Sequence, residues 1–177
     1  MIYIALLRGI NVGGHKKIKM EALRNSLESL HFKNLKTYIQ SGNVVFQFKD
    51  VGVEKISSNI SKKIKDDFGF DVPVIVKTYA ELKHVFLNNP FINKYEIEKL
   101  YVAFLSTNPS NELIDKFGSF GEDKYVFVND ILYLCYAESV SDSKLTNKII
   151  ESKLNVIATS RNWKTVTQLV LMSNDLN

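Results

Sequence analysis

Residues 36–48 read KTYIQSGNVVFQF and carry the clearest structural signal of the chain. Two runs of β-forming residues, 36–39 and 44–48, lie on either side of Gln40-Ser41-Gly42-Asn43. Glycine and asparagine accept the positive φ that a tight turn between antiparallel strands requires. The stretch therefore predicts a β-hairpin.

Helix-like and strand-like patterns surround this hairpin in a fixed order. Apolar residues at helical spacing predict one helix over 19–31 and another over 53–68, which Gly69 ends. Strands are predicted at 1–7 and 72–77, and the first is apolar on both alternating faces, as in a central strand covered on both sides. The order is β-α-β-β-α-β. The capping-box pattern Thr78-Tyr79-Ala80-Glu81 then opens an extra helix that stops before Pro90.

The second half of the chain repeats this order. We predict strands at 99–105, 124–128, 131–136 and 156–159, with the middle two joined by a turn at Asn129-Asp130. Helices are predicted to start at Asn108-Pro109, over 142–154 with Ser141 or Asp142 as cap, and over 162–173. The fold class is therefore α+β, with duplicated ferredoxin-like (β-α-β-β-α-β) units and an extra helix after each. We expect the units to span 1–90 and 91–177 and to pack as one body.

Composition excludes several classes of protein. A chain of 177 residues buries enough surface to fold without a metal or a disulfide, and its one cysteine, Cys135, lies in an apolar strand. The three histidines stand far apart, so we predict no metal site and no cofactor. No stretch approaches a membrane span and Ile2–Leu7 is too short for a signal peptide, which predicts a cytoplasmic protein without a membrane partner. The net charge of +4 is too small by itself to identify a nucleic-acid-binding protein.

The loop after the first strand is the main candidate site. It gathers glycines and cations between a strand end and a helix start, and the candidate ligand-binding residues are Arg8, Asn11, Gly13, Gly14 and Lys17. Exposed backbone N–H groups, a helix N-terminus and lysine charges together favour an anion such as phosphate. The loop is neither a Walker A motif nor a G-x-G-x-x-G fingerprint, so a flexible turn with solvated lysines is the alternative.

Two further segments carry candidate residues. In a β-α-β-β-α-β unit the hairpin turn lies at the same sheet end as the first loop, so Ser41 and Asn43 are predicted to face it; the alternative is that they only form the turn. Near the C-terminus, Arg161, Asn162 and Trp163 combine a cation, an amide and an aromatic ring suited to a phosphate and a stacked base. The alternative there is a helix cap followed by an aromatic anchor in the core.

Proteins with an RNA-recognition sheet share this topology, which makes that function a direct competitor. They stack bases on exposed aromatic residues of their central strands. The third strand here, 44–48, lacks the glycine-punctuated basic signature, and the first strand is apolar on both faces. A standard RNA-recognition sheet is therefore not expected.

Three segments of the sequence resemble a known bacterial family. The segments 5–14, ALLRGINVGG, and 37–46, TYIQSGNVVF, resemble domain-of-unknown-function family sixteen-ninety-seven, and 159–166 resembles its C-terminal signature, with Ser160 where threonine is usual. The resemblance implies a compact cytosolic α+β protein with a duplicated ferredoxin-like arrangement. It implies no activity and supplies no catalytic residues.

The sequence thus favours a non-catalytic protein that binds a phosphate-bearing ligand, either a nucleotide or a nucleic-acid backbone. One alternative is an enzyme acting on a small phosphorylated or anionic substrate, with Arg8 and Lys17 as electrostatic stabilisers. The other is a scaffold for protein interactions. An acid, base or nucleophile beside the first loop would favour the enzyme. The sequence names none, and it leaves the oligomeric state open.

Overall fold

The computed structural model describes all 177 residues, and contacts between them divide the chain into two units. The first unit comprises Met1–His84 and Gln168–Asn177, and the second comprises Val85–Thr167. This division differs from the predicted ranges 1–90 and 91–177 chiefly at the C-terminus. The last residues group with the first unit because Gln47 donates to the carbonyl of Leu176 at 3.0 Å and Tyr79 donates to Asn174 at 3.2 Å.

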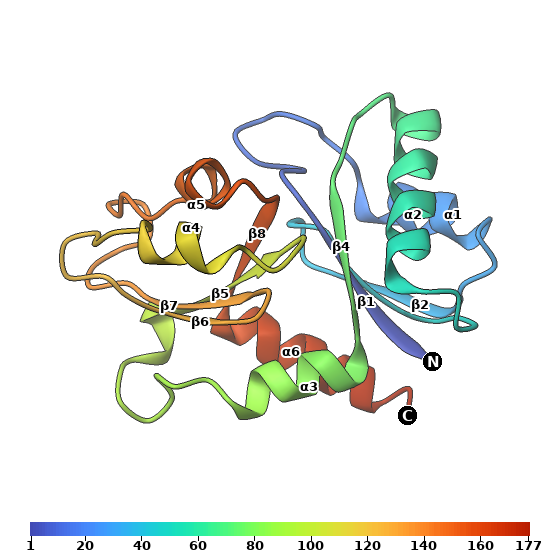
Figure 1. The fold of residues 1–177 in the computed structure, drawn as a ribbon. Helices are drawn as coiled ribbons and strands as arrows, with labels where there is room; N and C mark the ends of the chain where they lie inside the picture. The colour runs from blue at the N-terminus through green and yellow to red at the C-terminus, as the bar shows by residue number, and fades with distance from the viewer. The chain divides into compact units, whose positions relative to one another are not determined.

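The first unit has the predicted order of elements (Figure 1). They are β1 (Ile2–Leu7), α1 (Met20–Glu28), β2 (Lys33–Tyr38), β3 (Asn43–Gln47), α2 (Val53–Phe68) and β4 (Val74–Thr78), followed by α3 (Tyr79–Leu87). The sheet order is β2-β3-β1-β4 and every neighbouring pair is antiparallel, with Ala5 opposite Val44 on one side and Val76 on the other. The capping box is present, since the Glu81 carboxylate accepts from the Thr78 N–H at 2.7 Å.

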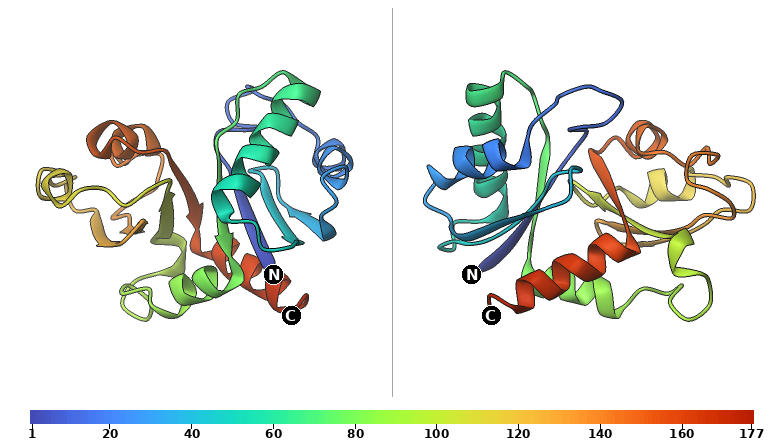
Figure 2. Two further views of the ribbon diagram at one scale, coloured as in Figure 1. Left: turned by 45° about the vertical axis from the view of Figure 1, so that its right-hand side comes forward. Right: turned by 180° about the vertical axis from the view of Figure 1, so that it is seen from behind.

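The core of the first unit lies between its sheet and the two helices α1 and α2, which cover one face of the sheet (Figure 2). Alternate residues of β1, including Tyr3, Ala5 and Leu7, point into this core. Their neighbours Ile4 and Leu6 are also fully buried, which confirms that the first strand is covered on both sides. That second face presents buried aliphatic residues, so no exposed aromatic platform of the RNA-recognition kind is formed.

The second unit repeats the arrangement. It contains η1 (Ile97–Lys99), β5 (Leu100–Leu105), α4 (Asn111–Asp115), β6 (Lys124–Val128), β7 (Ile131–Cys135), α5 (Asn147–Leu154), β8 (Ala158–Asn162) and the start of α6 (Trp163–Asn174). The sheet order is β6-β7-β5-β8, again antiparallel throughout. Leu132, Leu134 and Phe117 lie in its core together with residues of α5. The protein is thus an α+β fold of two repeated units with two four-stranded antiparallel sheets and six helices.

The repetition extends to individual hydrogen bonds at the end of each first strand. In the first unit Leu7 N–H donates to Gly42 O, and in the second Leu105 N–H donates to Asp130 O, both at 2.9 Å. The next residue continues the pattern, because Arg8 N–H bonds to Pro73 O and Ser106 N–H to Ile157 O, again both at 2.9 Å. The strand end, the hairpin turn and the segment before the last strand therefore meet in the same way in both units.

Three predicted boundaries in the second unit were wrong. The helix expected at Asn108-Pro109 begins at Asn111, because the Ser110 side chain accepts from the Leu113 N–H and caps it. The helix expected over 142–154 begins at Asn147 with Thr146 as cap. The Asp123 carboxylate accepts from the Ala137 N–H at 2.9 Å and from the Ser143 hydroxyl, and these bonds hold the preceding segment as a loop.

The strand expected at 156–159 also lies later in the chain, at Ala158–Asn162, where it pairs with β5. In the first unit, the helix expected over 19–31 is shorter, Met20–Glu28. No helix of the protein is both long and apolar enough to cross a membrane.

Candidate functional site

The first loop, residues 8–19, and the hairpin turn, residues 39–42, lie together at one end of the first unit's sheet, as predicted. Gly42 makes this approach possible. It has a φ of +78°, and a Cβ atom there would lie 2.7 Å from Ile10 Cδ1 and 2.8 Å from Leu7 Cβ. Any side chain would therefore both strain the backbone and push the loop away from the turn.

Asn11 fastens the loop to the turn. Its side-chain nitrogen donates to the carbonyls of Ile18 and Gln40, each at 2.9 Å, and its side-chain oxygen accepts from the Ile18 N–H at 2.9 Å. An amide has two N–H donors, and both are used here. Asn11, predicted as a ligand-binding residue, thus positions the loop by closing it at its base and joining it to the neighbouring turn.

Ser41 and Asn43 shape the turn itself. Asn43 is completely buried, and its side chain donates to Tyr38 O at 2.9 Å and to the Ser41 hydroxyl at 3.0 Å. These contacts match the alternative interpretation, in which the two residues form a good turn. Both lie beside the loop, but their polar atoms hold the hairpin together.

The exposed part of the loop is its glycine-rich tip. Gly13 and Gly14 have φ of +58° and +79°, lie at the surface, and their N–H groups bond to no other part of the chain. A Cβ at Gly13 would lie 3.7 Å from His15 Cδ2, and one at Gly14 would lie 4.0 Å from Lys17 Cε. The imidazole of His15 and the side chain of Lys17 are therefore the groups that a side chain at these two positions would meet first.

Positive charge dominates the loop. Residues 8–19 contain Arg8, Lys16, Lys17 and Lys19 and no carboxylate. Arg8 is half-buried, and the Lys16 ammonium donates to the backbone carbonyl of Asp71, which tethers that side chain. Lys17 and Lys19 are exposed and make no ion pair within the chain. The loop thus combines two exposed glycine amides with four cations, of which Lys16 is tethered and Lys17 and Lys19 are exposed.

The C-terminal candidates belong to the second unit and are largely buried. Arg161 is 6% exposed and donates to the Thr159 hydroxyl at 2.7 Å and the Ser160 carbonyl at 2.9 Å. Asn162 caps α6 by accepting from the Thr165 N–H at 2.8 Å. Trp163 is 3% exposed and stacks on Phe86 with ring centroids 5.4 Å apart. This segment has the geometry of the alternative interpretation, a helix cap followed by an aromatic anchor.

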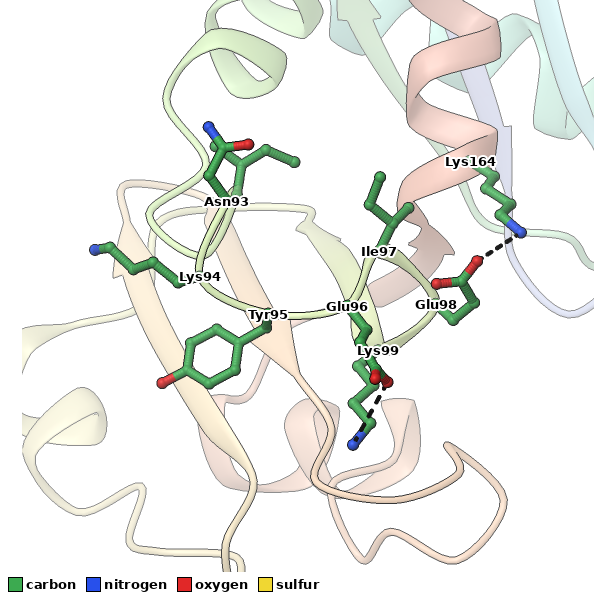
Figure 3. A pocket seen from close by; sticks show the side chains of 9 residues that line it. Asn93, Lys94, Tyr95, Glu96, Ile97, Glu98, Lys99 and Lys164 are labelled. Atoms are coloured by element: carbon green, nitrogen blue, oxygen red, sulfur yellow. Dashed lines mark ion pairs between the residues drawn. The ribbon is translucent and has the colours of Figure 1, made fainter.

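Sequence reasoning did not single out an open hollow of about 800 Å³ in the second unit (Figure 3). It is lined by residues 92–99 and Lys164. Lys164 pairs with Glu98 at 3.0 Å and Lys99 with Glu96 at 3.9 Å, and the hydrogen bond from Lys164 lowers the pKa of Glu98. The lining carries three lysines and two carboxylates, and two of these lysines pair with the carboxylates, so the hollow lacks the unbalanced positive charge of the first loop.

Other reactive side chains are dispersed. No group of three or more His, Cys, Asp or Glu side chains is placed to hold a metal ion. Cys135 is buried, and burial raises the pKa of its thiol. Burial likewise raises the pKa of Tyr133 to about 12, and its hydroxyl donates to Val85 O at 3.0 Å. Both residues lie in β7 of the second unit.

The protein is thus an α+β protein of two repeated units, and the first unit carries a basic loop with exposed glycines. The sequence matches the family described as a protein of unknown function, DUF1697, over residues 1–133, and the chain belongs to this family. The matched range includes the segments 5–14 and 37–46, whereas the third segment, 159–166, lies beyond it.

The chain is also similar to a solved structure, the conserved bacterial protein SP0830 from Streptococcus pneumoniae. The two share 23% sequence identity with a TM-score of 0.76, over 97% of each chain. A likeness at this identity establishes the fold alone. Among curated proteins no significant match is found.

Proposed function

We propose that this protein is a non-catalytic binder of a phosphate-bearing ligand, and that the first loop of the first unit is its binding site. The observation that carries the proposal is the difference between the two repeats. Twelve residues, 8–19, connect β1 to α1, whereas five residues, 106–110, connect β5 to α4. The flanking hydrogen bonds are the same in both units. The fold of a unit therefore does not require the seven additional residues of the longer loop.

The composition of the longer loop supports an anionic ligand. It contributes four positive charges, which equals the net charge of the whole chain, while the connection Ser106-Thr107-Asn108-Pro109-Ser110 is uncharged. Backbone N–H groups of Gly13 and Gly14 supply donors without a competing side chain. Charge-assisted hydrogen bonds from such groups to phosphate oxygens are stronger than neutral ones.

The composition of the loop favours binding over catalysis. Residues 8–19 contain no carboxylate and no cysteine, serine or threonine, which are the usual general acids, bases and nucleophiles besides histidine and lysine. The enzyme alternative is kept because His15, a residue type suited to proton transfer, lies in the same loop two residues after Gly13. The enzyme alternative is tested by measuring phosphate release from adenosine monophosphate and from p-nitrophenyl phosphate. Phosphate release by the wild type that is lost in His15→Ala would contradict our proposal of a non-catalytic binder.

A thermal-shift titration tests the proposal, using inorganic phosphate, ribose 5-phosphate, adenosine monophosphate and a short oligonucleotide. A ligand at 100 times its Kd stabilises the fold by about 2.7 kcal/mol, and we expect a rise in Tm of several degrees for at least one probe. Lys17→Ala with Lys19→Ala should remove the rise. The matched control is Lys62→Ala with Lys148→Ala. It removes the same two positive charges as the first double variant, but from exposed lysines outside the first loop. Equal loss of the rise in both double variants, or no rise with any probe, would refute the site.

We also propose that each half is a ferredoxin-like unit, that the natural domains are 1–90 and 91–177, and that the protein is cytoplasmic. The β-α-β-β-α-β order with sheet order β2-β3-β1-β4 supports the first point. A lone buried thiol suits a reducing compartment. Three experiments test these statements separately. Superposition of experimental coordinates on ferredoxin-like domains tests the fold of each unit, expression of 1–90 alone tests the domain boundary, and cell fractionation tests the location.

A further inference from the structure

Two exposed aliphatic side chains border the proposed phosphate loop. Val12 is 63% exposed and Ile39 is 47% exposed. Val12 follows Asn11 in the loop and Ile39 precedes Gln40 in the hairpin turn, and the hydrogen bond from Asn11 Nδ2 to Gln40 O, 2.9 Å long, joins those two neighbours. The two aliphatic residues therefore stand on adjacent segments at the same end of the sheet, beside Gly13.

Ile39 occupies a conformation that its side chain disfavours. Its φ is +47°, in the left-handed region, where a β-branched residue is an outlier. The hairpin turn of the second unit uses Asn129 at a φ of +54°, a residue type that tolerates this region. An exposed isoleucine in the left-handed region is a strained outlier, and such outliers cluster at ligand-binding sites.

The side chain of Gln40 adds a polar group to the same surface. It is exposed, and its carboxamide bonds to no other part of the chain. A carboxamide offers a donor and an acceptor side by side, which matches the hydrogen-bonding edge of a nucleobase. Inserted into lipid, the same carboxamide would lose its water and gain no partner. An aliphatic surface with a carboxamide beside it thus suits a base better than a bilayer.

We propose that the ligand is a nucleotide, with its base packed on Val12 and Ile39 and its phosphate at Gly13, Gly14 and Lys17. This inference rests on the proposed function and narrows its ligand from phosphate compounds in general to those carrying a base. A ligand with a base buries the two aliphatic side chains and pairs with Gln40. We therefore expect it to bind about tenfold more tightly than the same phosphate compound without a base, which corresponds to about 1.4 kcal/mol.

Calorimetric titration of the full chain with adenosine monophosphate, ribose 5-phosphate and inorganic phosphate tests the inference. We expect adenosine monophosphate to bind about tenfold more tightly than ribose 5-phosphate. Val12→Ser and Ile39→Asn should each reduce this ratio several-fold and leave the Kd of ribose 5-phosphate unchanged. Ile39→Asn is informative because asparagine tolerates the positive φ at this position and so removes backbone strain. The Tm of this variant should therefore rise while its affinity for the nucleotide falls. Val140→Ser, which alters an exposed valine in the second unit, should change neither Kd.

Each other outcome has a definite meaning. Equal affinity for adenosine monophosphate and ribose 5-phosphate, unchanged in both variants, overturns the role of the base while the phosphate site stands. Binding of none of the three compounds overturns the proposed function itself. Binding to anionic phosphatidylserine vesicles that is lost in Val12→Ser, without nucleotide binding, assigns the aliphatic pair to a membrane surface and overturns the inference.

Discussion

The ends of β1 and β5 present the same backbone arrangement with different connections attached. At both ends the strand donates to the hairpin turn and the next residue donates to the segment before the last strand. At β1 a long, basic, glycine-containing loop follows, and at β5 a short uncharged one. The comparison teaches that the repeat itself specifies the short connection, so the long one is the place to look for function.

The largest expected effect concerns the close approach at Gly42. Gly42→Ala should lower the free energy of unfolding by about 3 kcal/mol, since it adds backbone strain and overlap with Ile10 and Leu7. Gly9→Ala is the control, because Gly9 has a φ of +74° but nothing within 4 Å of the added Cβ; it should lose only about 1 kcal/mol. Urea unfolding of both variants measures the difference. Equal losses would show that the loop does not need to touch the turn.

The second effect concerns Asn11. Asn11→Ala removes three hydrogen bonds and should cost about 2 kcal/mol of stability while weakening phosphate binding through a displaced loop. Asn108→Ala alters an exposed asparagine in the corresponding connection of the second unit and should cost less than about 0.5 kcal/mol. If Asn108→Ala proves as damaging, the loop at β1 is no more ordered than its counterpart.

The third effect separates the cations of the loop. Arg8 directly follows the central strand, so its guanidinium is held more firmly than a lysine and is suited to bidentate phosphate contact. Arg8→Ala should therefore weaken the binding of inorganic phosphate by on the order of 1–3 kcal/mol more than Lys16→Ala does. The smaller effect at Lys16 is expected because its ammonium already donates to Asp71 O. Titration at two salt concentrations checks this, because exposed lysine charges are screened by salt. A larger loss in Lys16→Ala would reverse the assignment.

The smallest effect concerns Glu21, the carboxylate in the first turn of α1. A negative charge near the start of this helix opposes an anion bound at the preceding loop. Glu21→Gln should tighten phosphate binding by about 0.3–1 kcal/mol, and less at high salt. Glu112→Gln makes the same change in the first turn of α4 and should leave phosphate affinity unchanged.

Much of the fold was predictable because its signals are local. The alternating strands and the apolar spacing of Ile56, Ile60 and Ile64 gave the element order, and α2 has the predicted bounds. The start of α5 was not predictable, because it depends on hydrogen bonds that the distant Asp123 carboxylate accepts from Ala137 and Ser143. The predicted strand at 156–159 lay too early, which hid the fact that Arg161 belongs to a buried strand.

The candidate site was visible in part for the same reason. Glycines and cations of the first loop are neighbours in sequence, so their combination could be recognised directly. The hydrogen bond from Asn11 to Gln40 and the close approach at Gly42 join segments about thirty residues apart. These contacts could not be recognised from the sequence. The aliphatic pair Val12 and Ile39 was likewise missed, since exposure of an apolar residue is a property of the fold.

The most direct test of the account is a two-dimensional ¹H–¹⁵N NMR titration of the full chain with adenosine monophosphate and inorganic phosphate. Amide groups report a bound anion at the residue that contacts it. We predict that the amide signals of Gly13 and Gly14 shift with saturation, while those of residues 106–110 in the second unit stay in place. Saturable shifts confined to Arg161-Asn162-Trp163, or no shift at the two glycines, would contradict the account.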